Sequence, residues 1–400
     1  MVLTLSLVLT TVLAGAENTF AQTSLLPEDA QTVGVSYANA GMMKAASTDN
    51  TVAGNTIAAT NLNTGTPDAY KTIAYGRDGI YCPISIPSAG SFKIDICSLQ
   101  DTYVYLLDGL DLDAVTLKQV TVPGAVTEED VYSFTVRVEK GGTYFLVFQT
   151  AGYSTTQSAL TIGYIPSKKA GSNTTVTSGK AIYASVGGTS YRYYKITTAG
   201  LRYLTISFPW SDQGTSGKYK VKLMDSKKKK NLLKGVVTVG EGRNFVTYAG
   251  VPKGTYYVAV STAEDSSYQI KVSATKVSES SGSTRSGAKR IYKGGTKSGL
   301  ITATQSSTSG DWYKLVIGAT QTVKLDVTTK TGGYNGGIKV SVYSGSSSRA
   351  FGTAEYYYGE PASELSLYTS GYGGRLRAGT YYIKVQKYGC GSGYYKIKWK

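Results

Sequence analysis

The stretch GTYFLVF at residues 142–148 recurs as GTYYVAV at 254–260 and as GTYYIKV at 379–385. In each copy one side of the segment is consistently apolar and the other is mixed, which is the period-two pattern of a half-buried β-strand. The side chains predicted to face inward are Tyr144, Leu146 and Phe148; Tyr256, Val258 and Val260; and Tyr381, Ile383 and Val385. The offsets of 112 and 125 residues between the copies define the length of an internal repeat.

Each copy lies within the same order of neighbouring segments. A strand, a short turn and a second strand precede it, and a polar turn with a last strand follows it. The preceding strands are expected near 84–86 and 94–96, 194–196 and 204–208, and 312–315 and 323–327, and the last strands at 160–164, 268–272 and 394–399. Short strands between Gly-, Ser- and Asn-rich turns predict an all-β chain of three tandem antiparallel β-sandwich, jelly-roll-like domains after a signal peptide.

The composition shifts along the chain predict its boundaries. The apolar run at the start, followed by small residues, predicts a secretory signal peptide and hence an extracellular or cell-surface protein. The run is too short to span a membrane, so no transmembrane anchor is expected. The predicted segments are a signal peptide at 1–21, a loosely ordered leader at 22–55, an acidic sandwich at 56–165, and two basic sandwiches at 174–277 and 286–400.

The composition also bears on chemistry. The chain contains no His, which removes the commonest general base and the commonest metal ligand. Catalysis by paired carboxylates or by Ser with Lys is still compatible with the composition, but no spacing singles out such a pair. A non-enzymatic protein is therefore predicted. Among the three cysteines, Cys82 and Cys97 are expected to face opposite sides of a sheet, which favours buried thiols over a disulfide.

Two motifs carry a resemblance to a known family. The Gly-Thr-Tyr-Tyr-Val/Ile strand and the segment DWYKL at 311–315 are similar to bacterial pre-peptidase C-terminal domains. The resemblance covers the second and third repeats and, more loosely, the first. It implies β-sandwich accessory modules, often attached to secreted proteases or repeated in surface proteins, and some collagen-binding members bind calcium and matrix polymers. Here no recognisable protease domain accompanies the modules, and the acidic clusters of such calcium sites are sparse in repeats two and three.

Charge divides the repeats into two classes. Residues 22–165 contain 7 Lys and Arg against 14 Asp and Glu, whereas residues 166–400 contain 35 against 11. This asymmetry predicts an anionic partner for the last two repeats. For an exported protein we expect an anionic cell-wall polymer or polysaccharide, and other surface proteins as further partners, rather than nucleic acid. Solubility and exposed Lys on strand edges are the alternative interpretation.

Two groups of residues are candidates for ligand binding. Lys227, Lys228, Lys229 and Lys230 are expected in a hairpin loop, where they would either contact a phosphate polymer or simply be solvated. Exposed aromatic rings can cover sugar rings, and the Tyr-rich segment of repeat three offers Tyr356, Tyr357, Tyr358 and Tyr372 for that role. Cross-strand aromatic packing is the alternative for these tyrosines.

A third group consists of acidic residues in repeat one. Asp108, Asp111 and Asp113 could hold a hard cation such as calcium through loop oxygens, although their spacing does not match an EF-hand. A solvated hairpin loop is the alternative, and no other cofactor is expected. Together these features predict a secreted, non-catalytic binding or adhesion protein whose basic modules contact anionic polymers. The accessory region of a secreted hydrolase or protease, or a passive surface spacer, is the competing interpretation.

Overall fold

The computed structural model describes residues 57–64, 71–111, 113–125, 130–152, 154–209, 218–239, 244–262, 266–333, 336–357, 363–368 and 372–400. The signal peptide predicted at 1–21 and the leader predicted at 22–55 lie outside these residues. The described residues form strands, turns and bridges without a helix, so none of them belongs to a helix that could cross a membrane. The predicted all-β fold is confirmed.

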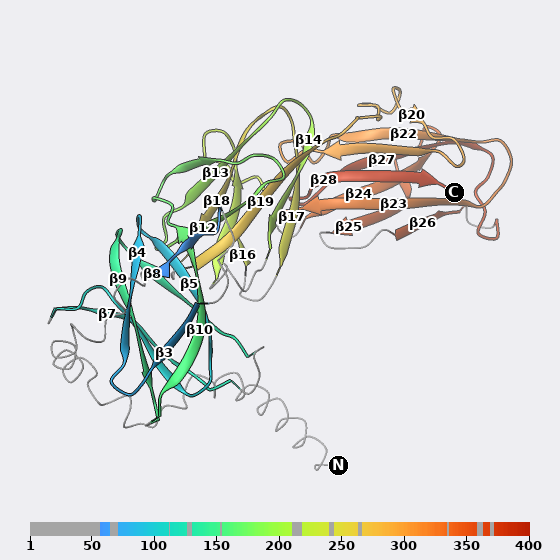
Figure 1. Ribbon diagram of the computed structural model, residues 1–400. Helices are drawn as coiled ribbons and strands as arrows, with labels where there is room; N and C mark the ends of the chain where they lie inside the picture. Colours follow the sequence, from blue (N-terminus) through green and yellow to red (C-terminus); the bar gives the residue numbers. More distant parts are fainter. Residues whose placement is uncertain are drawn as a thin grey trace, which may run out of the picture. The chain divides into compact units, whose positions relative to one another are not determined.

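The strands of the described residues form six sheets arranged in three pairs (Figure 1). The first pair contains β1 (Ile57–Ala58), β2 (Thr60–Asn61), β3 (Lys71–Tyr75), β4 (Ile80–Ile86), β5 (Gly90–Ser98), β6 (Thr102–Leu107), β7 (Thr116–Val122), β8 (Tyr132–Val138), β9 (Gly142–Thr150) and β10 (Thr156–Pro166). The second contains β11 (Asn173–Thr175), β12 (Ala181–Val186), β13 (Arg192–Thr198), β14 (Arg202–Phe208), β15 (Tyr219–Met224), β16 (Val237–Val239), β17 (Phe245–Val251), β18 (Gly254–Ser261) and β19 (Ser266–Lys276).

The third pair contains β20 (Lys289–Arg290), β21 (Thr296–Ile301), β22 (Gly310–Ile317), β23 (Val323–Gly332), β24 (Gly337–Ser344), β25 (Ala350–Tyr357), β26 (Ser363–Leu367), β27 (Gly379–Tyr388) and β28 (Ser392–Trp399). We refer to the three pairs as the first, second and third sandwich. By internal contacts the chain divides into two compact units, and the second and third sandwiches fall within one of them.

One topology recurs in all three sandwiches. A five-stranded sheet has the order β1-β4-β9-β6-β7, then β11-β13-β18-β15-β16, then β20-β22-β27-β24-β25. Its first strand is short and pairs in parallel with the second strand of the sheet. The second strand in turn pairs antiparallel with the third, as in β4 with β9, β13 with β18 and β22 with β27. The Gly-Thr-Tyr strand of the repeat is the central strand of this sheet each time. The repeat in the sequence is therefore a repeat of one scaffold.

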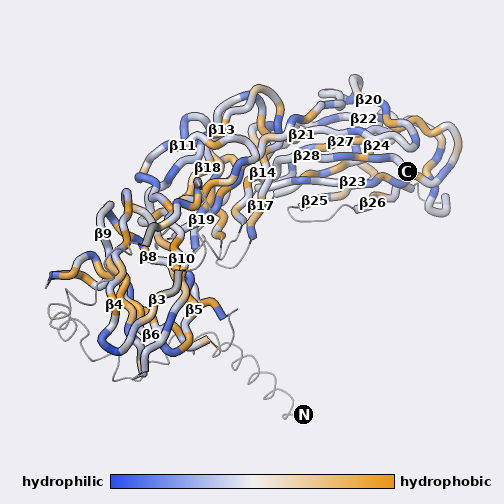
Figure 2. Tube along the Cα trace, in the orientation of Figure 1, coloured by the Kyte–Doolittle hydropathy of each residue, from blue (hydrophilic) through white to orange (hydrophobic). Residues whose placement is uncertain are grey.

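The inward side chains predicted for the central strands are all buried. Alternating hydropathy along the strands is visible in Figure 2, in keeping with cores that lie between facing sheets. The tyrosine of each Gly-Thr-Tyr motif also donates its hydroxyl to a carbonyl four residues earlier: Tyr144 to Lys140 at 2.8 Å, Tyr256 to Pro252 at 3.0 Å and Tyr381 to Arg377 at 3.1 Å. The motif thus secures the turn that leads into the central strand.

The cores of the second and third sandwiches contain a matching pair of tyrosines. The hydroxyls of Tyr194 and Tyr268 lie 2.7 Å apart, and so do those of Tyr313 and Tyr395. Because a buried hydroxyl needs a hydrogen-bonding partner, each pair satisfies its own polar atoms inside the core. The third sandwich adds an acid to the pair, because the Tyr395 hydroxyl donates to Oδ2 of Asp311 at 2.5 Å.

Two details of the sequence interpretation are tested here. Cys82 is buried and Cys97 is half-buried, and both are free thiols, as the parity argument favoured. In the sequence, Trp312 matches Tyr193 of repeat two and alternates with core positions, which predicts a place in the core, and the structure shows that this prediction is wrong. It is Tyr313, Leu315 and Ile317 of β22 that point inward, so Trp312 lies on the outer face of the sheet, 5.6 Å from the Tyr343 ring.

Candidate anion-binding face of the second sandwich

The outer face of the five-stranded sheet of the second sandwich is built by β13, β18 and β15. In the register of these strands, Tyr193 and Lys222 flank Ala259, while Lys195 and Met224 flank Tyr257. Because side chains alternate across a strand, these six residues share the face opposite the core. The small side chain of Ala259 in the central strand leaves room for the longer side chains on both sides.

Lysine ammonium groups lie over the tyrosine rings of this face. Nζ of Lys222 is 4.4 Å from the centroid of the Tyr191 ring, and Nζ of Lys228 is 4.0 Å from that of Tyr193 and 4.9 Å from that of Tyr257. A cation at these distances is attracted by the negative face of the ring. We call the set Tyr191, Tyr193, Tyr257, Lys195, Lys220, Lys222 and Lys228 the Lys–Tyr face.

The loop after β15 explains how Lys228 reaches this face. The carboxylate of Asp225 accepts the backbone N–H groups of Lys229 at 2.9 Å and Lys230 at 3.2 Å, which closes a tight turn. Lys228 takes a left-handed backbone conformation with φ of 57°, and its ammonium donates to Oδ1 of Asn173 on β11 at 2.6 Å. The turn therefore directs this one lysine back over the sheet.

The electrostatics of the face are one-sided. None of the five strands of the sheet contains Asp or Glu. Burial would raise the pKa of Tyr191, but hydrogen bonds with Lys222 and Ser261 and the charges of Lys222 and Lys220 lower it below its usual value. A phenol with a lowered pKa is a sign of positive potential at that point, because the anionic form is favoured.

The turn beneath the lysines holds a negative charge of its own. Burial alone would raise the pKa of Asp225, but hydrogen bonds from the amides of Lys230, Lys229 and Lys227 and the charge of Lys227 lower it. Its carboxylate is thus used within the turn. Lys227, Lys229 and Lys230 extend into solvent, whereas Lys228 is half-buried on the sheet. Of the four lysines predicted as ligand contacts, only Lys228 joins the Lys–Tyr face.

Sequence reasoning missed the other members of the face. The signal was present in the sequence: Tyr193 and Lys195 alternate with inward residues on β13, Tyr191 continues this phase just before the strand, and Lys220 and Lys222 alternate in the same way on β15. The sequence does not give the pairing and register that place β13 and β15 on either side of β18.

The tyrosines predicted for glycan stacking are not gathered into one site. Tyr356 is buried in the core, opposite Ile338. Tyr357 packs edge-on against Tyr388 with ring centroids 5.5 Å apart and donates to Oε2 of Glu355 at 2.9 Å. Tyr358 lies outside the described residues. Tyr372 is exposed, and the guanidinium of Arg377 lies 5.1 Å from its ring centroid.

The acidic residues of the first sandwich form a hairpin turn. Oδ1 of Asp108 accepts the N–H of Val115 at 2.6 Å, and the carbonyl of Asp111 accepts the N–H of Ala114 at 3.1 Å. Asp113 lies in the same turn between β6 and β7. Among the residues that the structure describes, no three His, Cys, Asp or Glu side chains are grouped so that they could hold a metal ion.

Comparison with known proteins gives likenesses in fold. The chain matches no family model and no curated protein sequence. A crystal structure of the pre-peptidase C-terminal domain of a collagenase from Bacillus anthracis is 18% identical, with a TM-score of 0.23, covering 32% of this chain and 100% of that one.

Two further structures are similar over longer stretches. The N-terminal CBM22 tandem domain of Xyn10C from Paenibacillus barcinonensis is 8% identical with a TM-score of 0.17, covering 54% of this chain and 96% of that one. A triple jelly-roll protein from an archaeal virus is 9% identical with a TM-score of 0.18, covering 84% and 89%. Identities and TM-scores this low carry no function from those proteins to this chain.

Proposed function

We propose that this chain is an extracellular, non-catalytic binding protein that attaches to anionic cell-surface or extracellular polymers through its basic sandwiches. The observation that carries this proposal is the Lys–Tyr face, where lysines converge on a sheet that contains no acidic residue. The sheet fixes the backbone positions of these lysines, and Lys222 and Lys228 are further positioned by the tyrosine rings on which they pack.

The tyrosines have a positioning role in this proposal. A lysine on an open surface loses side-chain entropy when it binds an anion. Packing Lys222 on Tyr191 and Lys228 on Tyr193 restricts both side chains beforehand, which lowers that cost. The exposed Lys227, Lys229 and Lys230 add long-range attraction that speeds the encounter with a polyanion. A flexible polymer of phosphodiester units would present its charges to both groups.

The experiment measures binding of the full chain to immobilised poly(glycerol phosphate), with uncharged dextran as the reference surface, across a series of ionic strengths. We expect binding to the phosphate polymer alone, weakening as salt rises because exposed charges are screened. The variant Lys220→Gln/Lys222→Gln should bind about 2- to 30-fold more weakly, because each exposed ion pair contributes about 0.2–1 kcal/mol.

The matched control removes the same charge from the opposite sheet. In Lys271→Gln/Lys276→Gln both substitutions lie on β19, which belongs to the four-stranded sheet. This variant should bind much like the unmodified chain. Equal losses in the two variants would show that only net charge matters, and an absence of binding at low salt would overturn the proposal in favour of a passive spacer.

A further inference from the structure

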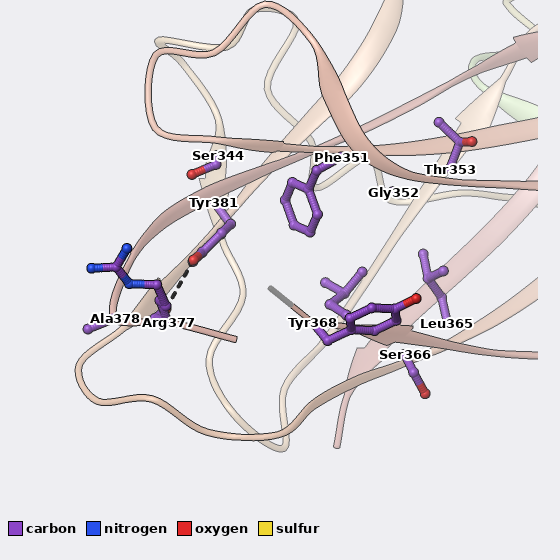
Figure 3. Close-up of a pocket in the computed structure, with 11 residues that line it drawn as sticks. Ser344, Phe351, Gly352, Thr353, Leu365, Ser366, Tyr368, Arg377, Ala378 and Tyr381 are labelled. Atoms are coloured by element: carbon purple, nitrogen blue, oxygen red, sulfur yellow. Dashed lines mark hydrogen bonds between the residues drawn. The ribbon is translucent and has the colours of Figure 1, made fainter. Parts of the chain in front are cut away.

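A groove of about 600 Å³ opens in the third sandwich between β25 and β26. These are the edge strands of the two sheets of that sandwich, so at this side no further strand of the described residues closes the space between the sheets. Figure 3 shows Phe351 and Tyr368 at two sides of the groove, with Arg377 and Tyr381 at one end. The volume lies within the range of sites that hold small molecules or short polymer segments.

A β-bulge directs Phe351 into the groove. In the pairing of β24 with β25, Val342 lies opposite Gly352 and Tyr343 lies opposite Ala350, so Phe351 is the extra residue. A bulge rotates the side chain of the extra residue relative to the regular pleat. The Phe351 ring thereby meets the Tyr381 ring edge-on, with centroids 5.6 Å apart.

The aromatic walls of the groove are open to solvent. Phe351 is 41% exposed and Tyr368, directly after β26, is 60% exposed. Tyr381 behind them is buried and fixed by its hydrogen bond to the Arg377 carbonyl. Two exposed rings facing one space are costly to leave in water, and they match the flat C–H faces of pyranose sugars.

The residues that line the groove also include polar side chains and one cation. Ser344, Thr353 and Ser366 also line the groove, and in Figure 3 their hydroxyls point away from the space between Phe351 and Tyr368. Arg377 is the charged residue among the eleven lining side chains, none of which is acidic. A guanidinium binds a carboxylate through two parallel hydrogen bonds. The guanidinium lies over the Tyr372 ring, 5.1 Å from the centroid, and Figure 3 shows it beyond the end of the groove, pointing away from Phe351 and Tyr368.

We infer that this groove is a binding site for a polysaccharide that contains hexuronic acid units, with sugar rings stacked on Phe351 and Tyr368 and a carboxylate at Arg377. The site goes beyond the proposed electrostatic attachment, and it does not use the Lys–Tyr face. Each site can therefore fail without the other.

Gly352 gives this inference a sharp test. A Cβ atom at this position would meet only Leu367 Cδ2, at 3.9 Å, so a side chain is tolerated by the surrounding protein. Gly352 itself lines the groove, and a larger residue there would occupy the space that a sugar needs. Gly352→Leu should therefore block the site while leaving the fold intact, because a strand accepts a side chain better than glycine.

The experiment titrates the full chain with hexasaccharides of galacturonate, glucuronate and mannuronate, and with their neutral hexose counterparts, by calorimetry. We expect at least one uronate to bind more tightly than its neutral counterpart. Tyr368→Ala and Gly352→Leu should each weaken that binding by about tenfold or more, since an aromatic contact and its buried area are both lost. Arg377→Gln should remove the preference for the acid and keep the binding of the neutral sugar.

Two controls separate this site from the Lys–Tyr face. Lys220→Gln/Lys222→Gln should leave the binding of the neutral hexasaccharides unchanged, because these sugars carry no charge for the Lys–Tyr face to attract, and Gly352→Leu should leave the binding of poly(glycerol phosphate) unchanged. Melting temperatures of all variants establish that they are folded. The inference is overturned if no uronate in the panel binds, or if folded Tyr368→Ala and Gly352→Leu bind as well as the unmodified chain does.

Discussion

The outer faces of the first and second sandwiches occupy the same place in the scaffold but differ in chemistry. In the second, the row across the central strand reads Tyr193, Ala259, Lys222. In the first, the equivalent row reads Tyr81, Val147, Tyr105, and all three side chains are buried in an apolar cluster with Leu107. The scaffold therefore fixes where these positions lie, and their side chains decide whether the face is covered or offers charge.

The outer face of the third sandwich is intermediate between these two, because it carries a charge that the protein itself binds. Its row reads Trp312, Lys384, Ser341. Nζ of Lys384 lies 5.6 Å from the centroid of the Trp312 ring and donates to the carbonyl of Thr308 at 2.8 Å. Burial lowers the pKa of this lysine. The charge is thus kept on the outer face but tied to the protein's own backbone, whereas the Lys–Tyr face directs several lysines outward.

Exchanging the central residue of these rows should give the largest effect. Val147→Lys places an ammonium in the apolar cluster of the first sandwich, and we expect the free energy of unfolding to fall by about 3–5 kcal/mol. The reverse change in the third sandwich, Lys384→Val, should cost about 1 kcal/mol because a single hydrogen bond and one cation–π contact are lost. Scanning calorimetry of both variants measures this difference, and equal costs would contradict the contrast between the faces.

A pH series distinguishes the third sandwich from the second. Burial, with the charge of Glu279 next, raises the pKa of Asp311 to about 7, whereas the equivalent residue of the second sandwich is Arg192, which hydrogen-bonds to backbone carbonyls. An unfolded Asp has a pKa near 3.9, so the folded state retains this proton over about pH 4–7. The contribution is fully present below that window and is lost as the pH rises through about 7.

The free energy of unfolding of the unmodified chain should therefore decrease between about pH 5 and pH 8. In Asp311→Asn we expect this decrease to be smaller by on the order of 2–3 kcal/mol. Denaturant titrations followed by tryptophan fluorescence report mainly on this sandwich, because two of the chain's three tryptophans, Trp312 and Trp399, belong to it. Asp326→Asn is the control, since Asp326 pairs with Lys400 at the surface. An unchanged slope in Asp311→Asn would show that this carboxyl is ionised in the folded state throughout.

The smallest expected change in stability comes from the tyrosine hydroxyl of the Gly-Thr-Tyr motif, which all three sandwiches share. Tyr144→Phe, Tyr256→Phe and Tyr381→Phe each remove one hydroxyl that donates to a carbonyl four residues earlier. Each should lower the free energy of unfolding by about 0.5–1.5 kcal/mol, and by similar amounts in all three. Thermal unfolding of the three variants checks this expectation. A large difference among the three losses in stability would mean that the hydrogen bond does not contribute equally in the three copies.

The sequence alone was enough for the scaffold. Period-two alternation in the Gly-Thr-Tyr strands identified the inward residues, because a strand that is buried on one face must alternate. Recurring turns between short strands indicated antiparallel sheets. Trp312 shows the limit of the same logic, because alternation in the sequence predicts that it is in phase with core positions, whereas the inward side chains of β22 are Tyr313, Leu315 and Ile317.

The binding surfaces depended on tertiary structure. The run Lys227 to Lys230 stands out in the sequence, yet a left-handed turn selects only Lys228 for the sheet. Tyr356 and Tyr357 are adjacent to each other, yet one is buried and the other packs on Tyr388. The groove needs a bulge at Phe351 and two edge strands from different sheets. Local sequence sets the parity of a strand, whereas register and long-range pairing decide which side chains meet.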